Sequence, residues 1–318
     1  MFPRGENRIS ADAMTNSNDM PLAAKPIDRA AHRRTDEAWL DDAFRRDDLL
    51  VLLLRDGAPL IGRDGGLVWM GPEVARISPG SPRLFLGEDK VGAPVFAVEL
   101  PPKFELAGSL IEGIGEFTDF RQAAARLPAM DANCASTARS LFLWHASHAF
   151  CSKCGGRNAL VDAGWKAQCT ACGAEHFPRT DPVAIMLAVK DGKALIGRQK
   201  FWPAGFMSCL AGFCEPGETI EQAAARELFE EAGIVCDPAQ AEYVACQPWP
   251  FPSSLMMGFI LPAQTDAINI DSKELESARW VPRAEMREIL SGKHSELFCP
   301  PSSAIAHHIL KVWAERDD

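Results

Sequence analysis

The sequence lacks any long apolar run. No stretch approaches the roughly 18 residues that a membrane-spanning helix requires, and the longest run, at residues 49–54, has the length of a buried strand. The N-terminus has no apolar signal core, its basic and acidic residues nearly balance, and the C-terminal Glu-Arg-Asp-Asp is not a peroxisomal address. We therefore expect no membrane partner, no secretion and a cytoplasmic location.

An excess of positive charge is also missing. With 33 basic and 43 acidic residues among 318, the formal net charge is -10. Such a chain has no general attraction for nucleic acid or anionic lipid. Any phosphate-bearing substrate must therefore be held by local groups or by bound cations. The hydrophobic fraction of 47% is ordinary for a globular protein, and the length allows two domains.

Composition and turn patterns divide the chain into a tail, an α/β domain, a cysteine-rich segment and a second α/β domain. The tail has no apolar period, which predicts flexibility, and Met14 and Met20 are alternative starts. Alanine-rich helices are expected at 120–127 and 138–149. The predicted boundaries are 1–38 for the flexible tail, 39–147 for the first domain, 148–177 for the cysteine-rich segment and 178–318 for the second domain.

An internal repeat links the two α/β domains. Residues 50–63 read LVLLLRDGAPLIGR and residues 185–198 read IMLAVKDGKALIGR. Both copies place Asp-Gly between apolar runs, which predicts a tight hairpin because this turn needs positive φ. We interpret the repeat as a duplicated domain; the alternative is a chance likeness between hairpins. No carboxylate cluster follows the first copy, so we expect that copy to be a non-catalytic scaffold or dimer surface.

The most informative segment, 212–234, reads GFCEPGETIEQAAARELFEEAGI. Thr219 and Gln222 fit a capping box, residues 220–232 favour a helix, and Gly233 is a natural stop beyond its end. The apolar stripe that predicts packing of this helix on a sheet consists of Ile220, Ala224 and Leu228.

Three acidic residues project from one face of this helix, because Glu227, Glu230 and Glu231 stand at i, i+3 and i+4. Like charges this close repel one another unless a cation is bound, and carboxylate oxygens suit Mg²⁺ or Mn²⁺. The alternative is a solvated acidic face with Arg226 in an ion pair. Glu218 is placed to anchor Arg226, which would then lock the rotamers of the glutamates.

The spacing of this segment resembles the complete Nudix box, with Gly212, Glu218, Arg226-Glu227-Leu228, Glu230-Glu231 and Gly233-Ile234 in the fixed positions. The resemblance implies an α/β fold, in which a loop–helix–loop lies on an α/β/α sandwich with a mixed sheet. It also implies metal-dependent hydrolysis of nucleoside diphosphates linked to another moiety. By position, the catalytic group is Arg226, Glu227, Glu230 and Glu231; the three glutamates and the Ala211 carbonyl bind the divalent metal, and Glu230 or Glu231 is the base toward water.

Two cysteine pairs have the spacing of a metal ribbon. Cys151-Ser-Lys-Cys154 is followed, after fourteen residues, by Cys169-Thr-Ala-Cys172. Four thiolates at this spacing suit one Zn²⁺ ion in a closed structural site; two disulfides or an iron–sulfur centre are the alternatives. The other six cysteines, which we interpret as small buried hydrophobic residues, are Cys134, Cys209, Cys214, Cys236, Cys246 and Cys299.

The segment 247–253, QPWPFPS, sets two aromatic residues among three prolines. Because proline fixes φ, this pattern predicts a rigid, partly exposed apolar wall for a flat ring; the alternative is a loop that packs its aromatics into its own core. Combined with the ribbon and the box, the segment resembles the NADH pyrophosphatase branch of the Nudix family over residues 40–318. The branch has Ser where this chain has Cys246.

This second resemblance implies a homodimer that cuts NADH or NAD⁺ into nicotinamide mononucleotide and AMP, and some members also remove NAD caps from RNA. It implies that Glu274 is a further metal ligand. Phe213 and Trp249 would border the nicotinamide, with Phe177 adding aromatic surface. Gly164 stands where some relatives have an acidic substrate contact, so that contact is missing here. The other implied substrate contacts are Gln247, Ser254, Ala306 through its backbone, and Arg121 of the first domain.

The sequence therefore predicts metal-dependent hydrolysis of the pyrophosphate bond of NADH or NAD⁺ by a Nudix domain that follows a degenerate Nudix-like domain and a zinc ribbon. Two alternatives keep the same chemistry: removal of NAD caps from RNA as the main activity, and another nucleoside-diphosphate-linked substrate such as ADP-ribose. A third alternative is a non-catalytic zinc-ribbon binding module on an inactive Nudix fold, and the intact box argues against it.

Overall fold

A computed structural model describes residue 20, residues 22–23, 27–77 and 79–316. It divides into two compact units. The N-terminal unit contains the described residues of Pro21–Asp181 together with Pro248–Leu255. The C-terminal unit contains those of Met1–Met20, Pro182–Gln247 and Met256–Asp318. Among these residues no helix combines the length and the apolarity needed to cross a membrane.

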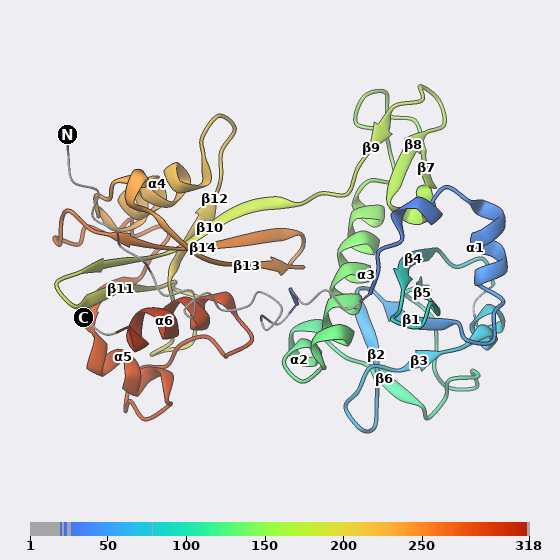
Figure 1. Cartoon of the computed structure of the whole chain (residues 1–318), viewed down its shortest axis with the longest axis horizontal. Helices are drawn as coiled ribbons and strands as arrows, with labels where there is room; N and C mark the ends of the chain where they lie inside the picture. The colour runs from blue at the N-terminus through green and yellow to red at the C-terminus, as the bar shows by residue number, and fades with distance from the viewer. Residues whose placement is uncertain (1–19, 21, 24–26, 78, 317–318) are drawn as a thin grey trace. The chain divides into compact units, whose positions relative to one another are not determined.

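A six-stranded mixed sheet forms the centre of the N-terminal unit, in the order β4-β5-β1-β2-β6 with β3 paired to β1 (Figure 1). Strands β1 and β5 are parallel, whereas β1 pairs antiparallel with β2 and β3. The strands are β1 (Leu50–Arg55), β2 (Ala58–Gly62), β3 (Trp69–Met70), β4 (Arg83–Glu88), β5 (Pro94–Glu99) and β6 (Gly115–Phe117).

Both faces of this sheet are covered, which explains why β1 reads as an unbroken apolar run. Leu52 and Leu54 join a buried cluster with residues of α2 and α3 on one face, while Val51 and Leu53 join a second cluster with residues of α1 and η4. The helical segments are η3 (Ala31–Arg33), α1 (Glu37–Ala43), η4 (Pro72–Arg76), α2 (Phe120–Ala124) and α3 (Ala129–Ser147).

Two sequence-based boundaries in this unit need correction. Helix α3 begins at Ala129, well before the predicted start at 138, because its N-terminal half also packs in the core and follows the natural break at Pro128. The tail predicted for 1–38 is too long where the structure describes it. Leu22 and Ile27 are buried in the core of the unit, although their spacing has no period that a pattern could detect. Residues 1–19, 21 and 24–26 lie outside the described residues.

The cysteine-rich segment forms a small antiparallel sheet in the order β7-β8-β9. The indole N–H of Trp165 in this segment donates a hydrogen bond to the carbonyl of Phe85 (2.8 Å), which fixes the segment to β4 of the N-terminal unit. The elements are β7 (Asn158–Val161), η5 (Asp162–Gly164), β8 (Lys166–Cys169) and β9 (Glu175–His176).

The C-terminal unit repeats the same architecture, with sheet order β13-β14-β10-β11-β15 and β12 paired to β10. Helix α4 covers one face of the sheet and α5 and α6 cover the other (Figure 1). The elements of this sheet and its helices are β10 (Asp181–Lys190), β11 (Lys193–Arg198), β12 (Leu210–Phe213), α4 (Ile220–Ala232), η6 (Pro238–Gln240), β13 (Glu242–Trp249), β14 (Ser254–Pro262), β15 (Ser277–Pro282), α5 (Arg283–Leu290) and α6 (Ile305–Glu315). The first residue of β10, the last two of β13 and the first two of β14 belong to the N-terminal unit.

The two sheets correspond strand by strand, as the duplication predicts. The turn of each repeated hairpin has two residues of positive φ: Asp56 (51°) and Gly57 (72°) in the first, Asp191 (49°) and Gly192 (69°) in the second. The copies differ after the short third strand of each, which is β3 in the first copy and β12 in the second. There β3 leads into the short η4, whereas β12 leads into a loop and the long helix α4. The first copy therefore lacks the element that carries the acidic residues.

Candidate active site

Helix α4 begins and ends where the sequence predicts. The Thr219 hydroxyl accepts a hydrogen bond from the backbone N–H of Gln222 (3.3 Å), and Gln222 Oε1 accepts one from the backbone N–H of Thr219 (2.8 Å). Gly233 ends the helix at φ 71°, a conformation that favours glycine. Ala224 and Leu228 of the apolar stripe are fully buried against the sheet. The glutamates are therefore held by a helix fixed at both ends.

Three carboxylates meet beside this helix, where oxygen atoms of Glu227, Glu231 and Glu274 lie within 4.8 Å of one another. Glu274 belongs to the loop before β15. The backbone N–H of Asp271 donates to the carbonyl of Glu231 (2.9 Å), and the N–H of Glu274 donates to the carbonyl of Asp271 (3.1 Å). These bonds tie the loop to the end of α4. The resemblance implied Glu274 as a ligand, and the fold brings it to the cluster.

Strand β12 borders the cluster because Gly212 has no side chain. A Cβ at this position would lie only 1.8 Å from Cδ of Glu227, so any larger residue would displace that carboxylate. The neighbouring Ala211 is an exposed residue whose backbone hydrogen-bonds Glu231. The backbone of β12 thus lies where a carbonyl ligand is needed, and the role of the Ala211 carbonyl stays a prediction.

The cluster is electrostatically unfavourable without a cation. Burial raises the pKa of Glu231 to about 8, and repulsion from Glu227 and Glu274 adds to the shift. Burial also raises the pKa of Glu227, although Arg226 opposes it. Glu231 is only 3% exposed, and its Oε1 atom is buried without a hydrogen-bond partner. This all-oxygen donor set with one unsatisfied atom fits a hard divalent ion such as Mg²⁺ or Mn²⁺.

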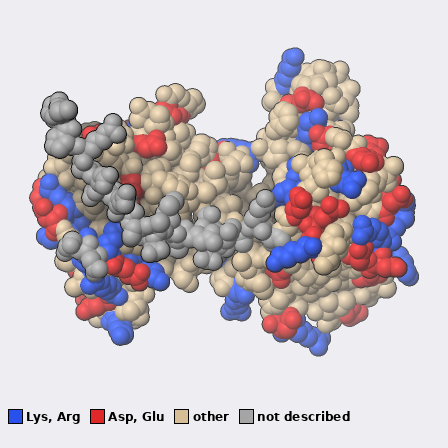
Figure 2. Space-filling view, in the orientation of Figure 1, with Lys and Arg blue, Asp and Glu red and all other residues tan. Residues whose placement is uncertain are grey.

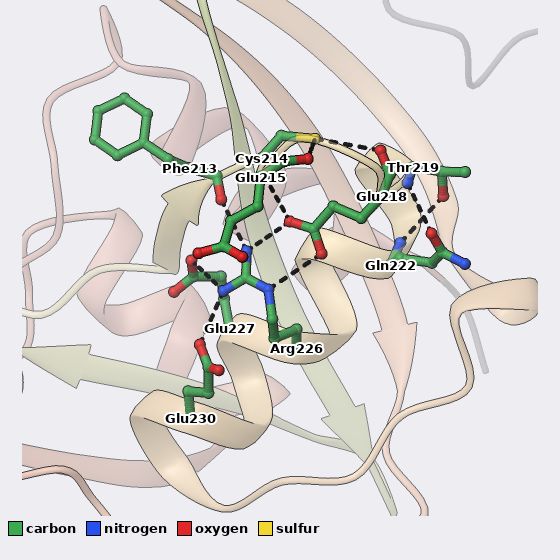
Figure 3. Close-up of polar contacts among 9 residues, drawn as sticks. All are labelled: Phe213, Cys214, Glu215, Glu218, Thr219, Gln222, Arg226, Glu227 and Glu230. Atoms are coloured by element: carbon green, nitrogen blue, oxygen red, sulfur yellow. Dashed lines mark hydrogen bonds and ion pairs between the residues drawn. The ribbon is translucent and has the colours of Figure 1, made fainter.

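Arg226 positions the box with all five of its N–H donors (Figure 3). Nε and Nη2 donate to the two carboxylate oxygens of Glu218 (3.1 and 2.7 Å), and Nη2 also donates to the carbonyl of Phe213 (2.9 Å). Nη1 donates to Glu227 (2.9 Å) and to Glu230 (2.8 Å). Hydrogen bonding to Arg226 lowers the pKa of Glu218. Glu218 therefore anchors Arg226, which fixes the rotamer of Glu227, as the sequence predicts.

Glu230 stands apart from the three-carboxylate cluster. Its side chain is 56% exposed, and it is directed to Arg226 (Figure 3). Helix periodicity grouped Glu230 with Glu227 and Glu231, because all three lie on one face. The fold instead brings Glu274 to Glu227 and Glu231. Glu231 has a buried oxygen without a hydrogen-bond partner, and this feature favours Glu231 over Glu230 as the essential carboxylate.

The four ribbon cysteines form the second cluster, with all four Sγ atoms within 4.8 Å of one another. The sulfurs of Cys151 and Cys172 are 3.8 Å apart, and those of Cys154 and Cys169 are 3.4 Å apart. These distances exceed the roughly 2.05 Å of a disulfide. They approach the edge of about 3.8 Å expected for a tetrahedron with Zn–S bonds of about 2.3 Å. The donor set fits one zinc ion better than two disulfides.

Two further contacts support a thiolate site in the ribbon. The backbone N–H of Cys172 donates to Cys169 Sγ (3.5 Å), and this bond is the main cause that lowers the pKa of Cys169, whereas hydrogen bonds with the neighbouring thiols raise the pKa of Cys154. His176 Nε2 lies 3.3 Å from Cys151 Sγ. Sequence reasoning missed His176, because only the pairing of β9 with β8, which sets it opposite Ala167, brings it to the sulfur.

The six other cysteines are only partly the buried residues that the sequence predicts. Half of them are buried, and the other half are partly exposed because they lie in the box loop, near the end of β13 and in the segment before α6. The buried group is Cys134, Cys209 and Cys236, and the partly exposed group is Cys214, Cys246 and Cys299.

The proline-rich segment forms an aromatic cluster within the N-terminal unit. The rings of Trp249 and Phe251 meet edge to face at 5.1 Å, and Phe251 lies 5.8 Å from the ring of Phe120 in α2. Cζ of Arg121 lies 3.8 Å from the Phe251 ring centroid and 6.0 Å from that of Trp249. Trp249 and Phe251 pack against a buried core yet stay partly exposed, so each interpretation of the segment holds in part.

Gln247 and Ala306 are brought together in the C-terminal unit. Gln247 is completely buried; its Nε2 donates to the carbonyl of Ser303 (2.9 Å) and its Oε1 accepts from the backbone N–H of Ile305 (2.8 Å). These bonds fix the first turn of α6, in which Ala306 is buried. This geometry supports an indirect role for Gln247, and direct substrate contact by either residue stays a prediction.

The remaining predicted contacts differ in exposure. Phe177 and Phe213 are 65% and 59% exposed, as ring-binding residues without a ligand can be, and Ser254 is half-buried. Gly164 is buried at φ 89°, and a Cβ there would lie 2.2 Å from Cδ2 of Leu84. A side chain at this position would be strained by the positive φ and would require Leu84 to shift, so glycine is favoured here.

The sandwich and the carboxylate helix define a Nudix hydrolase fold, and comparison with protein families identifies each part of the chain. The NUDIX domain model matches residues 178–299, the NADH pyrophosphatase zinc ribbon model matches 146–177, and the NADH pyrophosphatase-like rudimentary NUDIX domain model matches 43–144. The last match confirms the duplication inferred from the repeat.

Three curated relatives show how far the similarity extends. The NAD-capped RNA hydrolase NudC of Mycobacterium bovis is 33% identical, over 95% of this chain and 99% of that protein. The human NAD-capped RNA hydrolase NUDT12 is 44% identical over 60% of this chain, and the mouse mitochondrial NAD(P)H pyrophosphatase NUDT13 is 37% identical over 67%. The chain spans 43% and 63% of the length of these last two proteins. This chain belongs to the Nudix hydrolase family, in the branch with an NADH pyrophosphatase zinc ribbon.

Proposed function

We propose that this protein hydrolyses the pyrophosphate bond of NADH or NAD⁺ to nicotinamide mononucleotide and AMP. In this proposal Mg²⁺ or Mn²⁺ binds at the carboxylate cluster, one Zn²⁺ ion binds in the ribbon, and the protein acts as a homodimer. The observation that carries the proposal is the buried, unsatisfied oxygen of Glu231 among three carboxylates. The full-length match to a hydrolase of NAD-capped RNA supports a dinucleotide as the substrate.

In this reaction the residues of the chain have three separate roles: metal binding, positioning of a carboxylate and stacking with the nicotinamide. Bound divalent ions would neutralise pyrophosphate charge and lower the pKa of an attacking water. Glu227, Glu231 and Glu274 would hold the ions, and Arg226 keeps the Glu227 carboxylate in place. Glu231 must give up its proton when an ion binds. Trp249 offers a flat apolar ring on which a nicotinamide can stack.

Product analysis tests the proposal directly. Zinc-replete protein with Mn²⁺ is incubated with NADH, NAD⁺, ADP-ribose and diadenosine compounds, and the nucleotides released are separated by chromatography. We expect nicotinamide mononucleotide and AMP in equal amounts from NADH or NAD⁺. Turnover of ADP-ribose alone would reject the nicotinamide substrate, and no mononucleotide from any dinucleotide would reject the enzyme assignment.

Removal of NAD caps from RNA is the second candidate, because two of the relatives carry that name. On the face drawn in Figure 2, Lys and Arg side chains are interspersed with Asp and Glu and form no continuous basic track. Together with the net charge of -10, this distribution favours recognition of the NAD cap itself over binding of the RNA chain that follows the cap. Comparing kcat/KM for free NAD⁺ and for capped RNA distinguishes the two.

The raised pKa of Glu231 predicts how metal affinity depends on pH. A cation must displace the proton, so affinity for Mg²⁺ should rise about tenfold per pH unit below pH 8 and level off above it. In the metal-free protein the sign is opposite: the stabilising contribution of protonated Glu231 is full below the ordinary Glu pKa and is lost as pH rises toward 8. Titration calorimetry of zinc-replete protein at pH 6, 7, 8 and 9 measures the first effect. Equal affinity at pH 6 and 8 would contradict it.

A further inference from the structure

Arg139 of α3 joins two segments of the N-terminal unit that are far apart in sequence. Its Nη1 donates to the carbonyl of Gly57 (2.7 Å) and its Nε donates to the carbonyl of Pro250 (3.0 Å). Its Cζ lies 5.3 Å from the ring centroid of Phe251 and 5.9 Å from that of Phe120. One guanidinium therefore bridges the hairpin turn between β1 and β2 and the proline-rich segment.

The hairpin turn of the first repeat is shaped to receive this guanidinium. A Cβ at Gly57 would lie 2.4 Å from Arg139 Nη1. The equivalent Gly192 of the second repeat has almost the same φ, but a Cβ there would meet nothing within 4 Å. Positive φ accounts for both glycines, whereas close approach of an arginine distinguishes the first. The turn of the non-catalytic copy thus has a partner that the catalytic copy lacks.

The guanidinium of Arg139 donates its hydrogen bonds to backbone carbonyls rather than to a carboxylate. Among the described residues it forms no ion pair within 4.0 Å. Burial lowers its pKa, the charge of Asp119 partly opposes this shift, and Arg121 adds to it. A half-buried cation without a directly paired carboxylate is costly unless its N–H groups donate hydrogen bonds to other acceptors. Arg121 contacts Phe251 as well, at 3.8 Å. Phe251 is thus in contact with two arginines of the rudimentary domain.

We propose that Arg139 is a positioning residue. It is anchored by its hydrogen bond to Gly57, and its hydrogen bond to the carbonyl of Pro250 keeps Trp249 and Phe251 in one orientation. The rudimentary domain then takes part in nicotinamide recognition by fixing the aromatic wall. This inference rests on the proposed function. Fixing the wall before binding reduces the ordering cost of substrate association, so Arg139 acts on affinity more than on the chemical step.

The test compares Arg139→Ala and Arg139→Lys with Arg126→Ala, a control that removes an exposed arginine next to α2. For Arg139→Ala we expect KM for NADH and Kd for nicotinamide mononucleotide to rise about tenfold, with kcat within about twofold and Mg²⁺ affinity unchanged. Lysine keeps the charge but not the fork of donors, so Arg139→Lys should fall between Ala and wild type. The control should match wild type.

Hydrogen exchange separates positioning from general destabilisation. In both Arg139 variants the amides of Trp249, Phe251 and Ser253 should exchange faster, while those of α3 stay protected. Equal KM and Kd in wild type and Arg139→Ala, or faster exchange throughout the unit, would overturn the inference; if Arg139→Ala does not fold, Arg139→Lys decides by the same two measurements. Failure of wild type to bind nicotinamide mononucleotide would instead count against the proposed function.

Discussion

Replacing Glu231 by glutamine should lower kcat by about a thousandfold or more, with the fold intact. Glu231 is almost completely buried, and one of its oxygens has no protein partner. Glutamine has the same shape but cannot supply an anionic oxygen to a divalent ion. Because burial and like-charge repulsion already disfavour this carboxylate, the neutral amide should leave the metal-free protein as stable as wild type or more so. Initial rates with NADH and thermal unfolding curves measure the two effects.

Glu230→Gln is the matched control, since it makes the same change one residue away on the same helix. Its carboxylate is exposed and bound to Arg226, outside the three-carboxylate cluster. We expect a loss of no more than about tenfold, arising from a looser Arg226. Equal losses in the two variants would place Glu230 among the metal ligands. Full activity in Glu231→Gln would remove Glu231 from the catalytic site.

Replacing Cys169 by serine should abolish zinc binding and unfold the ribbon. Structural zinc sites contribute about 10–16 kcal/mol of apparent binding free energy, and the small sheet β7-β8-β9 has few other buried side chains. Zinc content should fall from one ion per chain to near zero, and residues 148–177 should become sensitive to protease. Mg²⁺ affinity at the carboxylate cluster should change little, because the zinc site has no open position.

Cys134→Ser provides the control, because Cys134 is a buried cysteine of the same unit that lies in the α3 core. It should keep one zinc per chain even if its stability falls. Elemental analysis of wild type also separates the alternatives for the ribbon: iron would indicate a cluster, and loss of four titratable thiols without metal would indicate disulfides. Full zinc content in Cys169→Ser would contradict the four-cysteine site.

Helix ends and the hairpin turn could be predicted from short sequence patterns. The capping residues Thr219 and Gln222, the stop at Gly233 and the hairpin turn at Asp56-Gly57 all act over a few residues, so their spacing predicts the backbone they form. Patterns failed where packing rather than periodicity decided. The N-terminal half of α3 and the residues Leu22 and Ile27 are buried against core residues that are far away in the sequence, so no short-range pattern predicts their structure.

The sequence by itself determined the chemistry available to this protein: a helix with a row of acidic residues, four thiols with zinc spacing, and two copies of one domain of which one lacks the acidic helix. Only the tertiary structure decided which groups meet. It brought Glu274, which only the family resemblance had indicated, to Glu231, turned Glu230 toward Arg226, brought His176 to Cys151 and connected Arg139 to Pro250. The reason is that periodicity fixes direction along one element, whereas burial, repulsion and contact depend on segments that arrive from elsewhere in the chain.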